Sequence, residues 1–313
     1  MDTVDAQHPA GAGTNASVRV RIDLAYDGTD FAGWATQPGL RTVQGEIEAA
    51  LATLFGGLEG AAGPRVVVAG RTDAGVHATG QVMHVDLDAE RLAGLSRADR
   101  GRPGGQEALA PTDVLARRLG GIVGRAGDIV IQQARIAPDG FDARFSPLWR
   151  RYEYRVADGA RAADPRSRRH TLAVRDVLDV DAMNTAADAL IGLRDFGAFC
   201  KPRDGATTIR TLEQYAWRRE NDGVLIATVR ADAFCHSMVR SLVGAAIAVG
   251  RGALAIDDLV AARDAAARTS VFPVVAAHGL TLVEVGYPAD DELALRAQQT
   301  RARREIAGTP PVA

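Results

Sequence analysis

Short strand-like and helix-like segments follow one another along this chain, without the strict strand–helix–strand alternation that builds a parallel sheet. Apolar and charged residues alternate over residues 18–24, which predicts a strand with one buried face. Apolar residues then recur at helical spacing over residues 47–54, after Thr42, a residue type that often caps helices. This mixture favours an α+β fold with largely antiparallel sheets flanked by helices.

The same kinds of segment recur in the second half of the chain. Strands are predicted at residues 65–69, 81–87, 129–136, 151–156, 209–218, 224–231 and 281–285, and helices at 181–193, at 236–249 and from Asp257. We therefore expect two similar halves, 18–140 and 141–288, with an active-site cleft between them. Residues 88–113 have weak periodicity and predict an inserted surface excursion, while 1–17 and 289–313 predict terminal tails.

The composition excludes several classes of protein. Of the 313 residues, 47% are hydrophobic and 24% are charged, which excludes a disordered chain. No apolar run approaches the roughly 18 residues of a membrane span, and the N-terminus lacks the features of a signal peptide, so a cytoplasmic protein is expected. Cys200 and Cys235 are too far apart for a Cys-x-x-Cys metal or redox site. We expect buried, inert thiols and no metal centre.

Arginine is concentrated in one segment of a chain whose net charge is only −2. The segment 144–175 holds nine arginines against three carboxylates. The nine are Arg144, Arg150, Arg151, Arg155, Arg161, Arg166, Arg168, Arg169 and Arg175. Because the guanidinium fork suits phosphate oxygens, the cluster predicts either a solvated basic loop or a phosphate-binding rim for a nucleic acid.

One short segment stands out chemically, Gly70-Arg71-Thr72-Asp73-Ala74-Gly75-Val76-His77, which lies between two predicted strands. Its two glycines permit a tight turn that holds a side chain outward. Asp73 stands close to Arg71 in the sequence, and the positive charge of Arg71 favours an ionised carboxylate that can act as a nucleophile or base. Taken alone, the same residues are also typical of a plain Asx-type turn.

The motif GRTDAGVHA, residues 70–78, resembles the active-site signature of the tRNA pseudouridine synthase A family. The resemblance continues in order from about residue 18 to 288. The other matching motifs are YDGTDFAGW (26–34), GQV (80–82), FDARFS (141–146), RRYEY (150–154), DF (195–196) and FCHSMVR (234–240). The chain departs from the family pattern at Ala35, at residues 119–129 and at residues 275–280, all outside the signature.

This resemblance implies the pseudouridine synthase fold and a homodimeric enzyme that needs no cofactor. The implied reaction converts uridine to pseudouridine at positions 38–40 in the anticodon stem-loop of tRNA, with Asp73 as the catalytic aspartate. Tyr152 is expected to stack on the flipped uracil and to assist proton movement. Arg71 and Arg240 are expected to contact the Asp73 carboxylate or a nearby phosphate. The residues expected along the path of the RNA are Arg144, Arg166, Arg168 and Arg169.

Two other classes of protein remain open on the sequence alone. A hydrolase of a C–N glycosidic bond would use Asp73 as nucleophile, but it would need a second carboxylate as acid, and no paired-carboxylate motif is present. A protein that binds or folds RNA without chemistry would not need an aspartate inside a double-glycine turn. Formation of pseudouridine, release of free uracil, or neither distinguishes the three classes.

Overall fold

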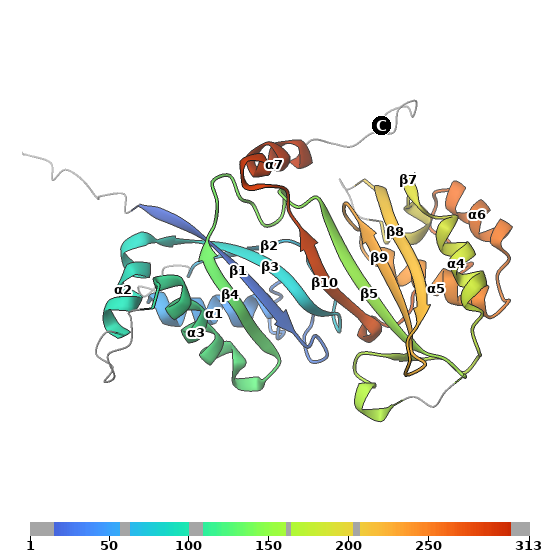
Figure 1. Ribbon diagram of the computed structural model, residues 1–313, viewed down its shortest axis with the longest axis horizontal. Helices are drawn as coiled ribbons and strands as arrows, with labels where there is room; N and C mark the ends of the chain where they lie inside the picture. The colour runs from blue at the N-terminus through green and yellow to red at the C-terminus, as the bar shows by residue number, and fades with distance from the viewer. Residues whose placement is uncertain (1–15, 57–62, 100–108, 161–163, 203–206, 302–313) are drawn as a thin grey trace, which may run out of the picture.

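The computed structural model describes residues 16–56, 63–99, 109–160, 164–202 and 207–301, and within these residues ten strands form one open sheet (Figure 1). The strand order is β4-β1-β3-β10-β5-β9-β8-β7, with β2 paired to β3 and β6 paired to β5. The strands are β1 (Ser17–Tyr26), β2 (Val66–Val68), β3 (His77–Asp88), β4 (Ile129–Ile136), β5 (Trp149–Ala157), β6 (Leu172–Ala173), β7 (Gly192–Asp195), β8 (Ile209–Arg219), β9 (Leu225–Ala231) and β10 (Leu280–Gly286).

Helices flank this sheet, as the sequence predicts. The α-helices are α1 (Val43–Phe55), α2 (Ala89–Asp99), α3 (Pro111–Val123), α4 (Val180–Asp188), α5 (Met238–Gly250), α6 (Ile256–Asp264) and α7 (Leu293–Arg301). Short 3₁₀ turns are η1 (Gly124–Ala126), η2 (Pro165–Ser167), η3 (Gly197–Phe199), η4 (Ala277–Gly279) and η5 (Asp290–Glu292). No helix in the described part of the chain has both the length and the apolar character needed to cross a bilayer.

The sheet is largely antiparallel, which confirms the predicted fold class; the β3–β10 and β5–β6 pairs are parallel. Strand β10 comes from the end of the fold in sequence but lies in the middle of the sheet. Leu282 of β10 pairs with Ala78 of β3 on one side and with Tyr152 of β5 on the other. Strand β10 therefore joins the earlier and later parts of the chain into one sheet (Figure 1).

The core follows from the patterns that predicted the elements. The apolar residues of β1 at positions 20, 22, 24 and 26 are buried, and the alternating charged positions are not. Thr42 caps α1, because its Oγ1 accepts a hydrogen bond from the Gly45 amide at 3.2 Å. Every residue of α5 except Arg240 is buried. An arginine on such a helix needs acceptors for its guanidinium, which makes Arg240 a residue of interest.

The predicted surface excursion over residues 88–113 is wrong for the described part of that segment. Ala89–Asp99 forms helix α2, and α3 begins at Pro111. Leu92 and Leu95 are buried, and α2 packs against α3 and β3. These few apolar residues give a weak periodic signal, and the neighbouring elements provide the burial that stabilises the helix. Residues 100–108 lie outside the described residues.

The predicted C-terminal tail is also wrong in its first part, because residues 293–301 form α7. Leu293 and Ala297 of this helix are buried, and the Leu293 carbonyl accepts a hydrogen bond from Ser146 Oγ at 3.2 Å. The helix predicted over residues 181–193 ends at Asp188, and β7 follows it. The remainder of the two predicted tails, residues 1–15 and 302–313, lies outside the described residues.

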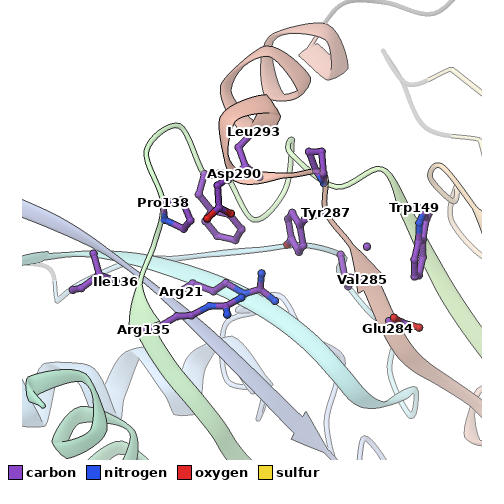
Figure 2. A pocket seen from close by; sticks show the side chains of 13 residues that line it. Arg21, Arg135, Ile136, Pro138, Trp149, Glu284, Val285, Tyr287, Asp290 and Leu293 are labelled. Carbon is purple, nitrogen blue, oxygen red and sulfur yellow. The ribbon is translucent and has the colours of Figure 1, made fainter.

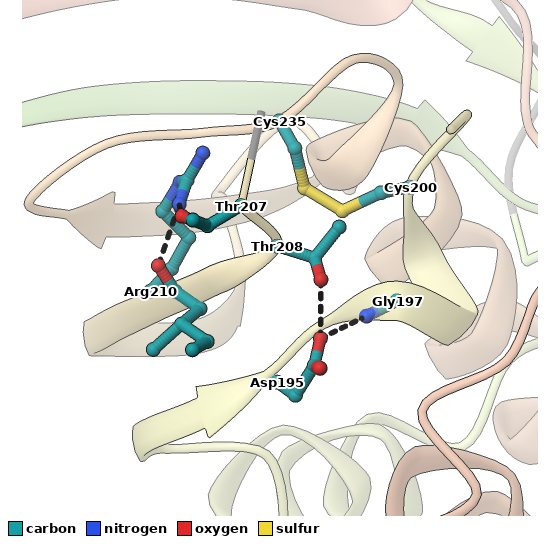
Figure 3. The surroundings of a disulfide bond; sticks show 8 residues. Asp195, Gly197, Cys200, Thr207, Thr208, Arg210 and Cys235 are labelled. Carbon is teal, nitrogen blue, oxygen red and sulfur yellow. Dashed lines mark hydrogen bonds between the residues drawn. A yellow bond between two sulfur atoms is a disulfide. The ribbon is translucent and has the colours of Figure 1, made fainter. Parts of the chain in front are cut away.

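The two cysteines form a disulfide bond, which corrects the prediction of free thiols (Figure 3). Cys200 follows η3 and is buried, and Cys235 lies shortly before α5. Their Cα atoms are 5.7 Å apart. The pair is 35 residues apart in sequence, so only the fold brings the two side chains together.

The disulfide predicts the number of reactive thiols in the purified protein. In the denatured, unreduced protein we expect no thiol to react with a chromogenic thiol reagent. After reduction we expect both cysteines to react, since the chain contains two. Two reactive thiols before reduction would contradict the pairing.

Candidate active site

The signature loop, residues 69–76, connects β2 to β3 and is anchored from beneath by buried side chains. Gln81 Nε2 donates hydrogen bonds to the Gly70 carbonyl at 2.8 Å and to the Tyr26 hydroxyl at 3.1 Å. The Tyr26 hydroxyl lies 2.8 Å from Thr72 Oγ1. Burial raises the pKa of Tyr26 to about 12, so its hydroxyl keeps its proton at neutral pH. These bonds fix the residues on either side of Arg71, next to Asp73.

The opening motif, residues 26–34, lies directly against the signature loop. The Trp34 amide donates to the Thr72 carbonyl at 3.0 Å, and the Gly75 amide donates to the Phe31 carbonyl at 3.3 Å. Gly33 has φ +95°, and a Cβ there would lie 2.9 Å from the Thr72 carbonyl oxygen. Glycine is required at this position both for the backbone angle and for the close approach. The two motifs that the sequence singled out thus form one packed unit.

His77 is part of this anchoring and does not line the cavity of Asp73. The ring is buried, and its Nδ1 accepts a hydrogen bond from the Gly28 amide at 3.1 Å. Its Nε2 faces the carbonyls of Arg169 at 2.9 Å and His278 at 3.1 Å. His77 therefore connects three segments of the chain.

Asp73 opens into a cavity of about 930 Å³ whose walls come from both the early and the late parts of the chain. The side chain of Asp73 is 34% exposed. Arg240 Nη1 lies 3.6 Å from Asp73 Oδ2, and His236 Nε2 lies 3.6 Å from Asp73 Oδ1. Arg240 is held in place because its Nε donates to the Val275 carbonyl at 2.7 Å. The structure therefore places one guanidinium and one imidazole against the Asp73 carboxylate.

Tyr152 of β5 lines the same cavity. Its ring meets the edge of Phe234 at 5.1 Å between centroids, with the planes 85° apart. A Cβ at Gly70 would lie 3.7 Å from the Tyr152 hydroxyl, so the tyrosine reaches the start of the signature loop. Burial raises the pKa of Tyr152 well above its usual value, and the phenol is neutral at physiological pH. Tyr154, on the same face of β5, donates instead to the Ala276 carbonyl at 2.7 Å and is part of the core.

Arg150 also lines the cavity, although the sequence analysis does not predict it as a site residue. It is buried, and its guanidinium donates to three carbonyls, those of Ala69 and Asp232 at 2.8 Å and that of Arg144 at 2.9 Å. It thereby ties the start of the signature loop to β9 and to the turn before β5. Its even spacing from Tyr152 on a strand is the signal that it faces the same way.

The other predicted arginines occupy different positions. Arg71 lines the cavity and is exposed. Among the described residues, the arginine that forms the expected ion pair with Asp73 is Arg240 and not Arg71. Arg144 is exposed at the cavity wall. Arg166, Arg168 and Arg169 are exposed and lie outside the cavity wall, although Arg169 reaches Asp30 of the opening motif at 3.4 Å. Arg161 lies outside the described residues.

A second cavity, of about 600 Å³, is lined by the side chains drawn in Figure 2. Its wall includes Arg21, Trp149 and Tyr287. Trp149 alternates with Arg150 along β5, so the two side chains point to opposite faces. None of the predicted site residues lines this second cavity. Within the described residues, no group of three or more His, Cys, Asp or Glu side chains is placed to hold a metal ion.

Comparison with known proteins gives a consistent result. A family profile described as tRNA pseudouridine synthase matches residues 186–288. The tRNA pseudouridine synthase A of Leifsonia xyli subsp. xyli is 56% identical over 293 residues, which cover 94% of this chain and 100% of that protein. The proteins of the same name from Streptomyces avermitilis and Mycobacterium leprae are 50% and 47% identical, over 92% of this chain and 95% and 96% of theirs.

The chain belongs to the tRNA pseudouridine synthase A family. The resemblance inferred from the sequence motifs is thus confirmed. The matched profile covers the segment with Arg240, and the alignments with the full-length relatives span nearly the whole chain. The sequence comparison and the geometry agree. The motifs that resemble the family, at residues 26–34, 70–78, 150–154 and 234–240, meet around one cavity.

The contact between the opening motif and the signature loop predicts an unequal effect of two glycine substitutions. Gly33→Ala places a Cβ against the Thr72 carbonyl, whereas Gly39→Ala, also at a positive φ of +71°, meets no atom within 4 Å. We expect Gly33→Ala to lower the free energy of unfolding by about 1–3 kcal/mol more than Gly39→Ala. Urea unfolding measures the difference. Equal losses would contradict the close packing of the two motifs.

Proposed function

We propose that this protein converts uridine to pseudouridine at positions 38–40 in the anticodon stem-loop of tRNA, with Asp73 as the catalytic aspartate. The family makes the chain a tRNA pseudouridine synthase, an isomerase. The observation that carries the residue assignment is the Asp73 carboxylate itself. It is partly exposed at the wall of a large cavity, with Arg240 and His236 each 3.6 Å away.

The proposed reaction rearranges atoms within one nucleotide. The bond from C1′ to the base nitrogen breaks, the uracil rotates, and a bond from C1′ to a ring carbon forms. That carbon loses a proton and the released ring nitrogen gains one, so the composition of the nucleotide is unchanged. Nothing is oxidised or reduced, and no external group is transferred. Asp73 has three roles open to it: attack at C1′, attack on the pyrimidine ring, or removal of a proton to form a glycal. In each role the positive charge of Arg240 orients the carboxylate towards the cavity.

Tyr152 is suited to hold the flipped base in this cavity. Its ring is fixed by the edge contact with Phe234, and it presents an aromatic surface on which uracil can stack. Its neutral hydroxyl can donate or accept a hydrogen bond, which suits a group that helps to move the proton from the ring carbon. Phe234 and His236 flank Cys235, so the disulfide holds the backbone between the two residues that contact Tyr152 and Asp73.

A glycoside hydrolase would need a second carboxylate near Asp73. Among the described residues that line the cavity, Asp232 is the one carboxylate besides Asp73, and its side chain is buried. Its Oδ1 accepts hydrogen bonds from the Thr211 amide at 3.1 Å and the Ala233 amide at 2.6 Å. A carboxylate used in this way caps a strand end. The site therefore favours isomerisation over hydrolysis.

The cavity wall also suits a polyanion. Besides Arg240, it contains Arg71, Arg144, Arg150 and Arg210, against the two carboxylates already described. The exposed guanidiniums of Arg71 and Arg144 are suited to phosphates beside the extruded nucleotide. We further propose that Arg166, Arg168 and Arg169 extend this path past the opening motif. We also propose that the enzyme acts as a homodimer, as its family resemblance implies, and that it acts in the cytoplasm.

The assignment of Asp73 predicts the behaviour of Asp73→Asn. The substitution keeps the shape of the side chain and removes the charge that a nucleophile or base needs. We expect kcat for pseudouridine formation to fall by at least about 10³-fold, with tRNA affinity within a few-fold of wild type. Asp188→Asn, an exposed change on α4 outside the cavity, serves as the control and is expected to retain full turnover. Substantial turnover by Asp73→Asn would show that Asp73 is not the catalytic aspartate.

The proposed RNA path predicts the effect of replacing Arg166, Arg168 and Arg169 together with alanine. With fewer arginines on the phosphates, binding releases fewer counterions, so log affinity should depend less steeply on log salt, by up to about one unit for each arginine that neutralises a phosphate. We expect weaker binding of every tRNA substrate. The matched control replaces the exposed arginines Arg125, Arg135 and Arg251, which lie outside the cavity of Asp73. If the slope of log affinity against log salt is unchanged in the first variant, the three arginines belong to a solvated loop and do not contact phosphate.

A further inference from the structure

Helix α7 is docked onto the turn that precedes β5, and this turn forms part of the cavity wall. Figure 1 shows α7, in dark red, beside the connection from β4 to β5. Ser146 of the turn donates to the Leu293 carbonyl, and Arg296 Nε donates to the Pro147 carbonyl at 3.3 Å. A Cβ at Gly140 would lie 2.6 Å from Ala294 Cβ, so the turn and the helix are in close contact. The position of α7 is therefore set by the turn.

Arg301, in the last turn of α7, packs against the ring of Phe145, which Arg144 also contacts. The Cζ of Arg301 lies 4.8 Å from the centroid of Phe145, and the Cζ of Arg144 lies 5.0 Å from the same centroid. Cation–π contact and stacking of this kind hold a guanidinium in place while leaving its N–H groups free for other acceptors.

Asp142 organises this group. Its Oδ1 accepts the backbone amides of Arg144 at 2.8 Å and Phe145 at 3.0 Å, which closes the turn. Its Oδ2 accepts a hydrogen bond from Arg301 Nη2 at 3.1 Å. The Asp142 side chain is only 14% exposed, whereas that of Arg301 is 53% exposed. The carboxylate is thus enclosed by its partners, and the outer surface of the group is formed by guanidinium.

This group shares the cavity with the signature loop. Arg144, Phe145 and Thr300, the neighbour of Arg301, line the same cavity as Asp73. The cluster therefore lies at a wall of the catalytic cavity that α7 helps to build. Arg144 lines this cavity, and Arg301 lies against the same ring next to the wall residue Thr300. Two guanidiniums held on one ring are suited to bind phosphate.

We propose that Arg144, Phe145 and Arg301 form a clamp for the phosphates of the tRNA strand that enters the cavity, and that α7 is part of the RNA-binding surface. The inference rests on the proposed function, because that function supplies RNA as the ligand. Phe145 pre-orients both guanidiniums, and Asp142 fixes Arg301 from behind. The clamp reads the backbone and not the base, so it raises affinity for every tRNA substrate alike.

The test is tRNA binding to the full-length protein as a function of salt, with an unmodified tRNA transcript as the probe. We expect Arg301→Ala to weaken binding several-fold and to reduce the slope of log affinity against log salt by about one unit. In steady-state turnover, KM should rise more than kcat falls. Arg301→Lys keeps the charge but loses the planar fork, so its affinity should fall between those of wild type and Arg301→Ala.

Two control variants separate phosphate contact from other effects. Arg296→Ala removes another arginine of α7, one that donates to the Pro147 carbonyl and is not one of the two arginines over the Phe145 ring. Arg125→Ala removes an exposed charge outside the cavity wall. Both should retain the wild-type salt slope. A wild-type slope for Arg301→Ala would overturn the clamp, and so would an equal loss of slope in Arg296→Ala, because docking of α7 would then explain both.

The same measurements separate the clamp from the proposed function. If the wild-type protein forms pseudouridine and Arg301→Ala binds tRNA as wild type does, the clamp alone fails. If the wild-type protein binds tRNA with a slope that depends on Arg301 but forms no pseudouridine, the clamp is supported and the proposed function fails.

Discussion

The close backbone contact between residues 26–34 and the signature loop is the constraint on which the rest of the site depends. The two strands that the loop connects, β2 and β3, would by themselves leave it free to move between their ends. Hydrogen bonds from Trp34 to Thr72 and from Gly75 to Phe31 hold it from one side, and Gln81 and Tyr26 hold it from beneath. A catalytic carboxylate needs such a support, since small displacements of a reacting group cost large factors in rate.

The central position of β10 explains how distant parts of the sequence meet at Asp73. Because β10 pairs with both β3 and β5, the strand that follows the signature loop and the strand that carries Tyr152 lie one strand apart. The segment just before β10 supplies the Val275 carbonyl that fixes Arg240. Helix α5 then presents Arg240, its one incompletely buried residue, to the carboxylate. The site is thus a product of sheet order and not of any local segment.

The sequence predicts what local patterns encode. The alternation in β1, the cap at Thr42 and the motif around Asp73 are visible in the chain itself, and each has its expected place in the structure. Helices α2, α3 and α7 are not predicted. The stability of α2 and α7 comes from packing on α3 and on the turn at Ser146, and such packing leaves little periodic signal. Proximity in sequence favours Arg71 as a partner of Asp73, whereas the fold supplies His236 and also Arg240, which the family resemblance had indicated. The Cys200–Cys235 pair escapes prediction for the same reason.

The central claim is that the cavity around Asp73 isomerises uridine in the anticodon stem-loop of tRNA. Site-resolved detection of pseudouridine in an unmodified tRNA transcript, combined with an assay for free uracil, tests it most directly. The account predicts pseudouridine confined to positions 38–40, with no uracil released. Release of uracil would show glycosidic hydrolysis. A transcript that stays unmodified, or pseudouridine elsewhere in the tRNA, would equally contradict the account.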